Sequence, residues 1–462
     1  MSIQGTLRKA DFKTIQTRSK RDPQWFINRV LQVTFLTPQQ VELCNSIRDR
    51  KRTAAPSGHG IGKTFLAACI VLWFLFSFPG AKILTTAPTW FQVENLLWSE
   101  VRKLLARSLF AGMCQAALTS IKLTDDWFAI GLSTNDATRF QGIHAPYVLI
   151  VFDEATGVAT EIWEAAEGVA VGSRDRFLAI GNPTDPTSEF KRKCDSPLWH
   201  VINLSSEQHP NVLSGREIVR GAVTRDWVDE RLQEYGGKDT ALYRARVLGL
   251  FPEQGDDMLI SLADVERAQS RWVAPAGVPQ ALGVDVARFG SDETVEIEFF
   301  AGGVIGVPRS TLGQNTMVTA GKIKASLALK KAVDDAGVGG GVTDRLREQK
   351  VSVLAYNAGE RAVESDRFLN RRAETWWMIR EALKKNEISL PPDNKLAADL
   401  TNIKFTYTSR GQIKLESKDD IKKRLGRSPD RGDALAILLA AVHQPKKVVF
   451  KQQSTFQGQV SY

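Results

Sequence analysis

A short stretch at positions 57–64 has the residue types of a phosphate-binding loop. It consists of Ser57, Gly58, His59, Gly60, Ile61, Gly62, Lys63 and Thr64. The glycines would let backbone N–H groups close around a phosphate chain, Lys63 would reach the β- and γ-phosphates, and the Thr64 hydroxyl would bind Mg²⁺. The apolar residues that follow predict a helix whose N-terminal dipole faces the anion. Ser57 stands where the usual spacing has its first glycine, and the alternative is a Gly-rich turn before a buried helix.

A pair of acidic residues comes directly after an apolar run at positions 147–152. Residues 147–152 are continuously apolar, as expected of a strand buried on both faces of a parallel sheet, and Asp153 and Glu154 follow directly. At the carboxyl end of such a strand, Asp153 would hold Mg²⁺ and Glu154 would polarise the attacking water. An isolated acid pair more often marks a polar turn. Because a phosphate loop precedes it, ATP hydrolysis is the favoured interpretation.

Three further acids lie in the second half of the chain. Asp285 lies within the apolar strand-like run 281–287, Asp334 ends another, and Asp433 begins an apolar helix. A carboxylate inside an apolar strand is costly unless it is paired or binds a cation. In a ribonuclease H-like fold these three positions converge. They would hold two Mg²⁺ or Mn²⁺ ions, about 3.5–4 Å apart, for phosphodiester cleavage.

Each of these acids also has a structural interpretation. Asp285 could be an ion-pair partner, Asp334 a turn residue and Asp433 a helix N-cap. Asp430 and Asp335 are neighbours that could assist or substitute. The order of all three acids on the expected elements favours a nuclease, with Asp433 preferred to Asp430 because it begins the helix.

The elements that must position these residues differ between the two halves. The first half alternates strands and helices, which argues for an α/β parallel sheet. The expected strands are 52–55, 82–87, 127–132, 147–152 and 177–180, with a helix at about 90–108. Residues 205–250 are helical and charged, as in a lid or linker.

The second half begins with three meandering strands and continues with alternating helices and strands. The expected strands are 281–287, 294–300, 304–309, one ending at Asp334, and 351–356, followed by a hairpin near 404–416 and a final helix from about Gly432. This is the order of a ribonuclease H-like fold with a mixed sheet.

At 462 residues the chain is too long for one core and indicates two or three domains. We predict an α/β protein with a P-loop ATPase domain and basic N-terminal segment at 1–204, a lid or linker subdomain at 205–274, a ribonuclease H-like nuclease domain at 275–445 and a basic tail at 446–462.

Charge and cysteine usage narrow the class of protein. A formal net charge of +9 favours a polyanionic partner, although the basic ends could be merely solvated tails. The four cysteines are scattered without a metal-binding spacing, which fits a reducing cytoplasm and argues against structural zinc. The longest apolar run, residues 65–78, is shorter than the roughly 18–20 residues that span a bilayer, so no membrane association is expected.

An ATPase module joined to a ribonuclease H-like nuclease resembles the large terminase subunit of tailed bacteriophages over nearly the whole chain. The residues that carry the resemblance are 57–64, 152–155, 179–184, 284–285, 333–334 with the glycine-rich loop after it, and 429–434. The resemblance implies a motor that uses ATP to push double-stranded DNA through a portal into a procapsid, and that cuts concatemeric DNA.

The resemblance also implies several residue roles. Asn182, in the segment 181–183, would sense the nucleotide state. Gln40 would recognise adenine, although Thr37 and Pro38 beside it could form only a helix N-terminus. Arg139 would be an arginine finger acting on a neighbouring subunit, with surface stacking as the alternative.

The implied partners are double-stranded DNA, the small terminase subunit and the portal protein. The chain would be a monomer in solution and form a homo-oligomeric ring on the portal, in the cytoplasm of the infected host cell. Three rival functions are an ATP-dependent repair nuclease or resolvase, a DDD-type transposase, and an inactive nucleic-acid-binding scaffold.

Overall fold

The computed structural model describes residues 9–132, 140, 143–252, 257–287, 293–337 and 339–443. The chain folds as two compact units, Met1–Ala263 and Asp264–Tyr462. The division falls within helix α11 (Leu262–Ser270). The finer division into four segments stays a prediction.

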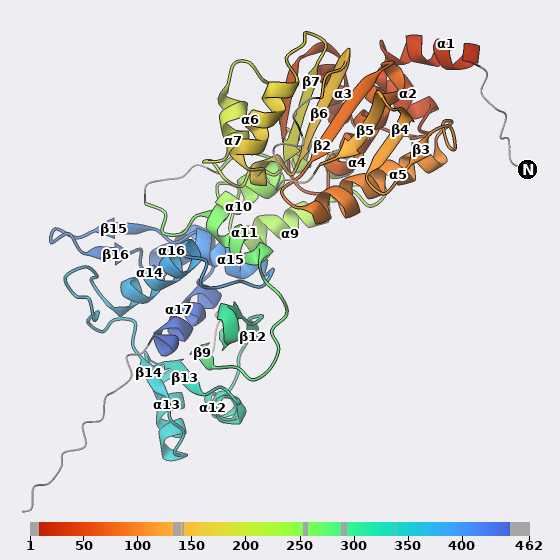
Figure 1. The fold of residues 1–462 in the computed structure, drawn as a ribbon. Coiled ribbons are helices and arrows are strands. Elements are labelled where there is room, and N and C mark those ends of the chain that lie inside the picture. Colours follow the sequence, from red (N-terminus) through yellow and green to blue (C-terminus); the bar gives the residue numbers. More distant parts are fainter. Residues whose placement is uncertain are drawn as a thin grey trace, which may run out of the picture. The chain divides into compact units, whose positions relative to one another are not determined.

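A largely parallel sheet forms the centre of the first unit (Figure 1). In the described residues its order is β3-β4-β5-β2-β6-β7-β1-β8, in which the pairs from β5 to β8 are parallel and β3, β4 and β5 pair antiparallel. The strands are β1 (Arg52–Pro56), β2 (Ala81–Thr86), β3 (Gln115–Ala116), β4 (Ser120–Thr124), β5 (Trp127–Gly131), β6 (Tyr147–Asp153), β7 (Arg176–Gly181) and β8 (His200–Val201). The predicted parallel α/β sheet is thus confirmed.

Helices cover this sheet. Helix α4 (Lys63–Ser77) is buried almost throughout and packs across β2, β5, β6 and β7, which explains its long apolar run. On β6, Phe152 stacks on Trp163 of α6 (Thr160–Val169) at a ring distance of 3.9 Å. In the described part of the chain, no helix has both the length and the apolarity needed to cross a membrane.

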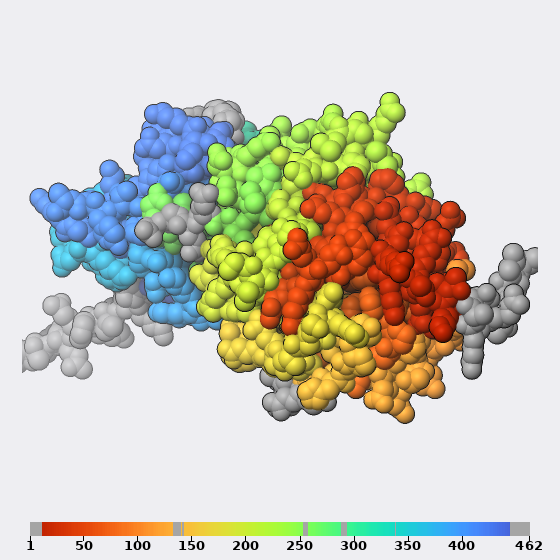
Figure 2. Space-filling model, turned by 90° about the horizontal axis from the view of Figure 1, so that it is seen from above, coloured from red at the N-terminus to blue at the C-terminus, as the bar shows by residue number. Residues whose placement is uncertain are grey.

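The N-terminal helices complete the first unit. Helices α1 (Lys9–Ser19) and α2 (Pro23–Arg29) pack on α4, and α3 (Pro38–Asp49) packs on β1. Figure 2 shows this segment, in red, lying against the rest of the unit. The helix expected at 90–108 is instead a π-helical turn, η1 (Gln92–Leu97), followed by α5 (Trp98–Arg107).

The segment after the sheet is built of short helices. They are η4 (Ser206–Gln208), α8 (Pro210–Ser214), α9 (Arg225–Tyr235), α10 (Ala241–Tyr243) and the π-helical turn η5 (Arg244–Leu248), whereas α7 (Glu189–Asp195) lies earlier, between β7 and β8. This agrees with the helical character expected for residues 205–250.

A mixed sheet forms the centre of the second unit. Strand β10 runs antiparallel to β9, β11 and β12, whereas β9, β13 and β14 are parallel, in the order β11-β10-β9-β13-β14. The strands are β9 (Ala281–Asp285), β10 (Thr294–Phe300), β11 (Val304–Ile305), β12 (Arg309–Thr311), β13 (Lys330–Asp334) and β14 (Leu354–Tyr356). This is the predicted ribonuclease H-like arrangement.

The remaining elements of this unit surround the sheet. They are α12 (Thr316–Ala325), α13 (Gly339–Glu348), α14 (Arg371–Lys384), α15 (Asn394–Thr401), the hairpin β15 (Phe405–Tyr407) and β16 (Ile413–Leu415), α16 (Lys418–Leu425) and α17 (Asp430–Val442). Helix α17 packs across β9, β10 and β13. A Cβ on Gly283 of β9 would lie 2.5 Å from the Leu438 backbone N, so this close approach requires glycine.

Several predicted boundaries in the second unit were wrong, and the strand expected at 351–356 is only β14 (Leu354–Tyr356). The strand expected at 304–309 is two short strands, β11 and β12, because Pro308 between them has no N–H for the ladder. The first strand ends at Asp285, so this acid lies at the strand's end and not in its middle. The last helix begins at Asp430 and not at Gly432, which places Asp433 inside its first turn.

Candidate active sites

The first site lies where three parallel strands end together. In the sheet register, Asp153 of β6 is the partner of Ile180 of β7, and Gly181 is the partner of Pro56 of β1. The phosphate loop follows Pro56 directly. The predicted loop, the acid pair and Asn182 therefore meet at one edge of the sheet, where α/β proteins bind ligands.

The loop has the backbone of a phosphate cradle. Gly60 and Gly62 have φ of 70° and 74°, in the left-handed region that favours glycine, and α4 begins at Lys63. A Cβ on Gly60 would lie 2.9 Å from the Cβ of Val223, so glycine is also needed for space. Ile61 is buried.

Residues of the helical segment 205–250 contact this loop. The His59 N–H donates to the Arg246 carbonyl at 2.7 Å, and Ser206 Oγ donates to the His59 carbonyl at 2.8 Å. The His59 ring stacks on Trp227 with centroids 6.4 Å apart. Burial, with Lys63 and Arg246 nearby, lowers the pKa of His59 to about 3. The imidazole is therefore neutral, and it packs instead of pairing with an anion.

Ser57 replaces a glycine without obstructing the loop. Its side chain is fully buried, and Oγ lies 3.1 Å from the Gly181 carbonyl and 3.2 Å from that of Ala55, to which it donates. The hydroxyl thus binds the sheet and not the space above the loop. Gly58 is close-packed against Ser206 and Val247.

Lys63 already contacts two of the predicted site residues. Its Nζ lies 2.5 Å from Asn182 Oδ1 and 3.2 Å from Glu154 Oε1. Asn182 in turn donates from Nδ2 to the Ser57 carbonyl at 2.6 Å. The side chain that would bind phosphate is thus linked to the residue predicted to act on water and to the predicted nucleotide sensor.

The predicted magnesium ligands also lie together. Thr64 hydrogen-bonds the Asp153 carboxylate, which is 1% exposed. Burial and the neighbouring Glu154 raise the pKa of Asp153 to about 7, although Lys63 and Thr64 oppose the shift. A hydroxyl and a buried carboxylate are oxygen donors of the kind Mg²⁺ prefers, so these residues fit the ion. Glu154 has a φ of 48°, an uncommon backbone for a side-chain residue that is often found at functional sites.

The Gln40 side chain joins the start of α3 to the phosphate loop. The Gln40 side chain accepts from Thr37 N at 3.0 Å and donates to the Ile61 carbonyl at 3.0 Å, so both ends of its amide are engaged. This is the helix-terminus alternative, with Thr37 as N-cap and a full capping box. Gln40 would have to release these bonds to bind a base. Arg139, the predicted arginine finger, lies outside the described residues.

The second site brings the three predicted nuclease acids to one cavity. Asp285 and Asp334 end the neighbouring parallel strands β9 and β13, and Asp433 lies in the first turn of α17. All three line a cavity of about 380 Å³ in the second unit. Asp285 and Asp433 are each 5% exposed.

Basic and aromatic side chains surround these acids. Lys418 Nζ lies 2.8 Å from Asp433 Oδ2 and 3.8 Å from Asp285 Oδ2. Trp376 Nε1 donates to Asp433 Oδ1 at 2.8 Å, and Arg372 Nε lies 3.4 Å from the same oxygen. The Lys418 ammonium group therefore lies between two of the carboxylates, as a bound metal ion would.

Burial and neighbouring charges shift the pKa of each of these three acids. Burial raises the pKa of Asp285 well above its usual range, with Lys418 opposing the shift. Burial also acts on Asp433, but Lys418 and Arg372 outweigh it and hold the pKa at about 2. The pKa of Asp334 is raised by burial. A site with two buried carboxylates and a third that is half-buried needs compensating positive charge, which fits divalent ions.

The neighbouring acids are engaged elsewhere. Asp430 Oδ2 accepts from the Glu293 backbone N at 3.0 Å, and Asp335 Oδ1 accepts from the Thr343 hydroxyl. Within the described ranges, no three His, Cys, Asp or Glu side chains are gathered closely enough to hold an ion as they stand. Ion binding would thus require Lys418 to withdraw and the carboxylates to close in.

Sequence reasoning missed the residues that surround the acids. Lys418 follows a hairpin, while Arg372 and Trp376 lie on α14, about 60 residues from Asp433. No spacing in the sequence relates them to the three acids. The hydrogen bond of Trp376 to a carboxylate becomes visible only when α14 and α17 are packed together.

Taken together, the two units define a class of protein with a phosphate-loop site on a parallel sheet and an acidic site on a ribonuclease H-like sheet. No known family profile matches the chain. The chain is 26% identical to the probable terminase large subunit of Enterobacteria phage P7 over 461 residues, covering 91% of each chain. This similarity confirms the resemblance to large terminase subunits that the motifs indicated.

Solved structures of two terminases are also similar. The large terminase from a thermophilic bacteriophage is 14% identical over 92% of this chain and 98% of its own, with a TM-score of 0.39. The nuclease domain of the large terminase subunit of bacterial virus Sf6 is 20% identical over 40% of this chain and 99% of its own, with a TM-score of 0.35.

Proposed function

We propose that this chain is the large subunit of a phage terminase, which hydrolyses ATP to move double-stranded DNA into a procapsid and cuts concatemeric DNA. One observation carries the proposal: a single chain holds a phosphate loop beside an acid pair, and three carboxylates around a second cavity. Whole-chain similarity to the P7 protein supports it.

In the ATPase, the loop at 57–64 would bind the phosphates of ATP, with Mg²⁺ held by Thr64 and Asp153. Bound there, the ion would neutralise charge on the phosphates. Lys63 would exchange its contacts with Glu154 and Asn182 for the phosphates. Glu154, released from the lysine, would then orient and polarise the attacking water. Asn182 would report the change to the loop through its bond to Ser57.

In the nuclease, Asp285, Asp334 and Asp433 would hold two divalent ions, Mg²⁺ or Mn²⁺. These ions would stabilise the attacking and leaving oxygens of the phosphodiester. Lys418 would leave the carboxylates as they take up ions, and its charge would then be available to a DNA phosphate. Contacts to phosphates carry no sequence information, so cutting would not require a fixed sequence.

The proposed setting is the cytoplasm of the infected host cell. The chain would act as a homo-oligomeric ring on the portal protein and receive DNA with the small terminase subunit. Its net charge of +9 suits a polyanionic partner, and DNA affinity should fall steeply with salt. Arg139 would supply charge to the ATP site of a neighbouring subunit.

The test is cleavage of plasmid DNA with Mg²⁺ or Mn²⁺ by the full chain and by Asp285→Ala. Asp344→Ala is the matched control, because this aspartate is exposed on α13 in the same unit. The proposal expects Asp285→Ala to lose cutting while the control keeps it. A wild-type protein that cuts nothing in any metal condition would contradict the nuclease, and joining of marked DNA ends would favour a transposase instead.

A further inference from the structure

Helix α17, which carries Asp433, has no capping side chain of its own. Its N-cap residue is Pro429, which makes no side-chain hydrogen bond. The first N–H groups of a helix have no partner within the helix, and leaving them unpaired inside a protein is costly. The partners must therefore come from another element.

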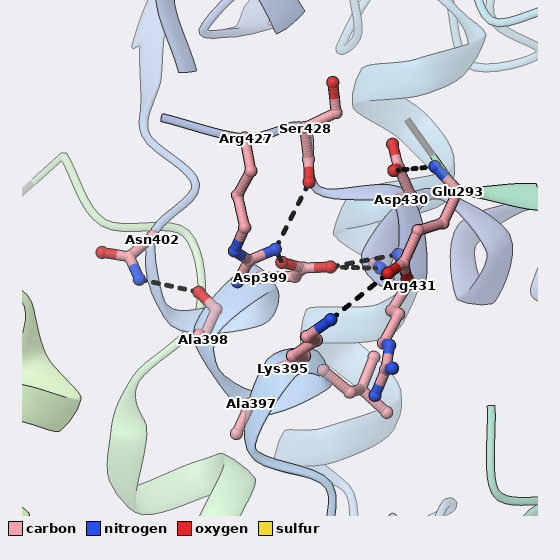
Figure 3. A network of polar contacts seen from close by, with 12 residues as sticks. Glu293, Lys395, Ala397, Ala398, Asp399, Asn402, Arg427, Ser428, Asp430 and Arg431 are labelled. Carbon is pink, nitrogen blue, oxygen red and sulfur yellow. Dashed lines mark hydrogen bonds and ion pairs between the residues drawn. The ribbon is translucent and has the colours of Figure 1, made fainter. Parts of the chain in front are cut away.

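Asp399 of α15 supplies them. Its Oδ2 accepts from the backbone N of Arg431 at 3.0 Å and of Gly432 at 3.2 Å (Figure 3). The carboxylate is also favourable at the positive end of the helix dipole. Asp399 therefore does for α17 what an N-cap side chain usually does, although it lies about 30 residues earlier in the chain.

The Asp399 carboxylate is itself fixed in place. It is 1% exposed, and its Oδ1 is paired with the guanidinium of Arg427. Arg427 also donates to the Ser428 carbonyl at 3.3 Å, at the entry to α17. A buried carboxylate that is paired and hydrogen-bonded has little freedom, so it sets the position of the N–H groups that it binds.

The same turn is tightly packed against the nuclease site. A Cβ on Gly432 would lie 2.4 Å from the ring of Trp376 and 3.3 Å from Cβ of Asp399. Trp376 binds Asp433 Oδ1 through Nε1. The first turn of α17 thus lies between Asp399 and Trp376, and a shift of this turn would move the Asp433 carboxylate relative to Asp285.

We propose that Asp399, held by Arg427, is a positioning residue of the nuclease: it caps α17 and thereby fixes the Asp433 carboxylate where ions bind. The inference rests on the proposed nuclease function. Asp399 does not line the cavity and is buried, so it would act through α17 and not by contact with ions or DNA. Since displacement by about 1 Å can cost about a hundredfold in rate, its loss should be felt in catalysis as well as in stability.

The test compares Asp399→Ala, Asp399→Asn and wild type in the full chain. It measures plasmid cutting against Mn²⁺ concentration, Mn²⁺ binding by electron paramagnetic resonance, and melting temperature. Asp393→Asn is the matched control. Asp393 also lies at α15 and pairs with Arg431, but through the guanidinium and not the α17 backbone, and an amide oxygen can still cap α15.

The expected result is a cutting rate at saturating Mn²⁺ about ten- to a hundredfold lower in Asp399→Ala, with weaker Mn²⁺ binding. Asp399→Asn should fall between it and wild type, because its oxygen still accepts from α17 but does not pair with Arg427. The Asp393→Asn control should stay within about twofold of wild type in cutting.

Two outcomes separate the proposals. If Asp399→Ala and Asp399→Asn lower only the melting temperature, while cutting and Mn²⁺ binding match wild type, Asp399 is merely structural and the inference is overturned. If wild type binds Mn²⁺ but cuts nothing, the proposed function fails, and the resonance titration of the variants alone decides whether Asp399 positions the ligands.

Discussion

The two candidate sites use the same position on a sheet but are assembled in different ways. In the first unit, the loop, Lys63 and Thr64 are consecutive in sequence, and the acid pair lies at the end of the nearby strand β6. In the second unit, the groups around Asp433 come from α14, α16 and α17. The first site is a local motif on a βα unit, whereas the second exists only once distant helices are packed.

Each site contains one lysine that contacts its acids, and the two lysines differ in where they come from in the chain. Lys63 contacts Glu154 and Asn182 and belongs to the loop that would bind phosphate. Lys418 bridges Asp285 and Asp433 from a separate helix, and these acids raise its pKa above the usual range despite the opposing effect of burial. The lysine of the first site thus lies where a substrate group would bind, whereas that of the second lies where an ion would bind.

The largest expected effect is the loss of DNA cutting without any loss of ATP turnover. Asp285→Ala should lower DNA cutting by more than about a hundredfold, since changes to the partners of metal ligands alone cost 10- to 100-fold. ATP turnover, measured by phosphate release in the same sample, should stay at the wild-type rate. A parallel loss of both activities would show that the sites are not independent.

The reciprocal change tests the first site. Glu154→Gln should lower ATP turnover by about 10²–10⁴-fold, because the group that polarises water is lost while the shape is kept. Plasmid cutting without ATP should be unchanged. Glu161→Gln, at an exposed position of α6, is the control. An unchanged ATPase rate in Glu154→Gln would reject the role of this residue.

Lys418→Ala sharpens the contrast between the two lysines. Removal of the cation that bridges Asp285 and Asp433 should let Mn²⁺ bind more tightly, by about tenfold if about 1.4 kcal/mol of competition is relieved. Calorimetric titration with Mn²⁺ measures this. Lys423→Ala, at an exposed position of the same helix, should bind Mn²⁺ as wild type does. Weaker binding in Lys418→Ala would mean that the lysine supports the site and does not compete.

The smallest effect should come from Ser57→Gly, which restores the usual loop spacing. The buried hydroxyl contacts the sheet, so ATP turnover should stay within about twofold of wild type while stability falls by about 1–2 kcal/mol from lost hydrogen bonds and added chain freedom. Thermal unfolding and phosphate release measure the two quantities. A large gain in turnover would instead mean that Ser57 hinders the phosphate.

The sequence predicted best those features that are formed by residues close together in the chain. The phosphate loop, the strand-end positions of Asp153 and Asp334, and both sheet types follow from periodicity and motif spacing, because each depends on neighbouring residues. The break between β11 and β12 is also predictable from sequence, because Pro308 has no N–H for the ladder. Lys418, Trp376 and Asp399 could not be predicted, because their contacts depend on how α14, α15 and α16 pack on α17.

Gln40 illustrates the same limit within the first unit. Its type and place before β1 predict a base-binding residue, which stays a prediction, and in the fold its amide joins the cap of α3 to the phosphate loop. That both the oxygen and the nitrogen of this amide are hydrogen-bonded can be seen only once their partners are placed in the fold. For Gln40 the helix-terminus alternative is observed, whereas for Asp433 it is excluded. Asp433 is not the N-cap of α17, because that helix begins at Asp430.

The most direct test measures ATP turnover and plasmid cutting side by side for wild type, Asp285→Ala and Glu154→Gln from matched preparations. Two independent sites on one chain predict a double dissociation, in which Asp285→Ala keeps only ATP turnover and Glu154→Gln keeps only cutting. If either substitution removes both activities from a protein that remains folded, or if neither changes its predicted activity, the two-site account is contradicted.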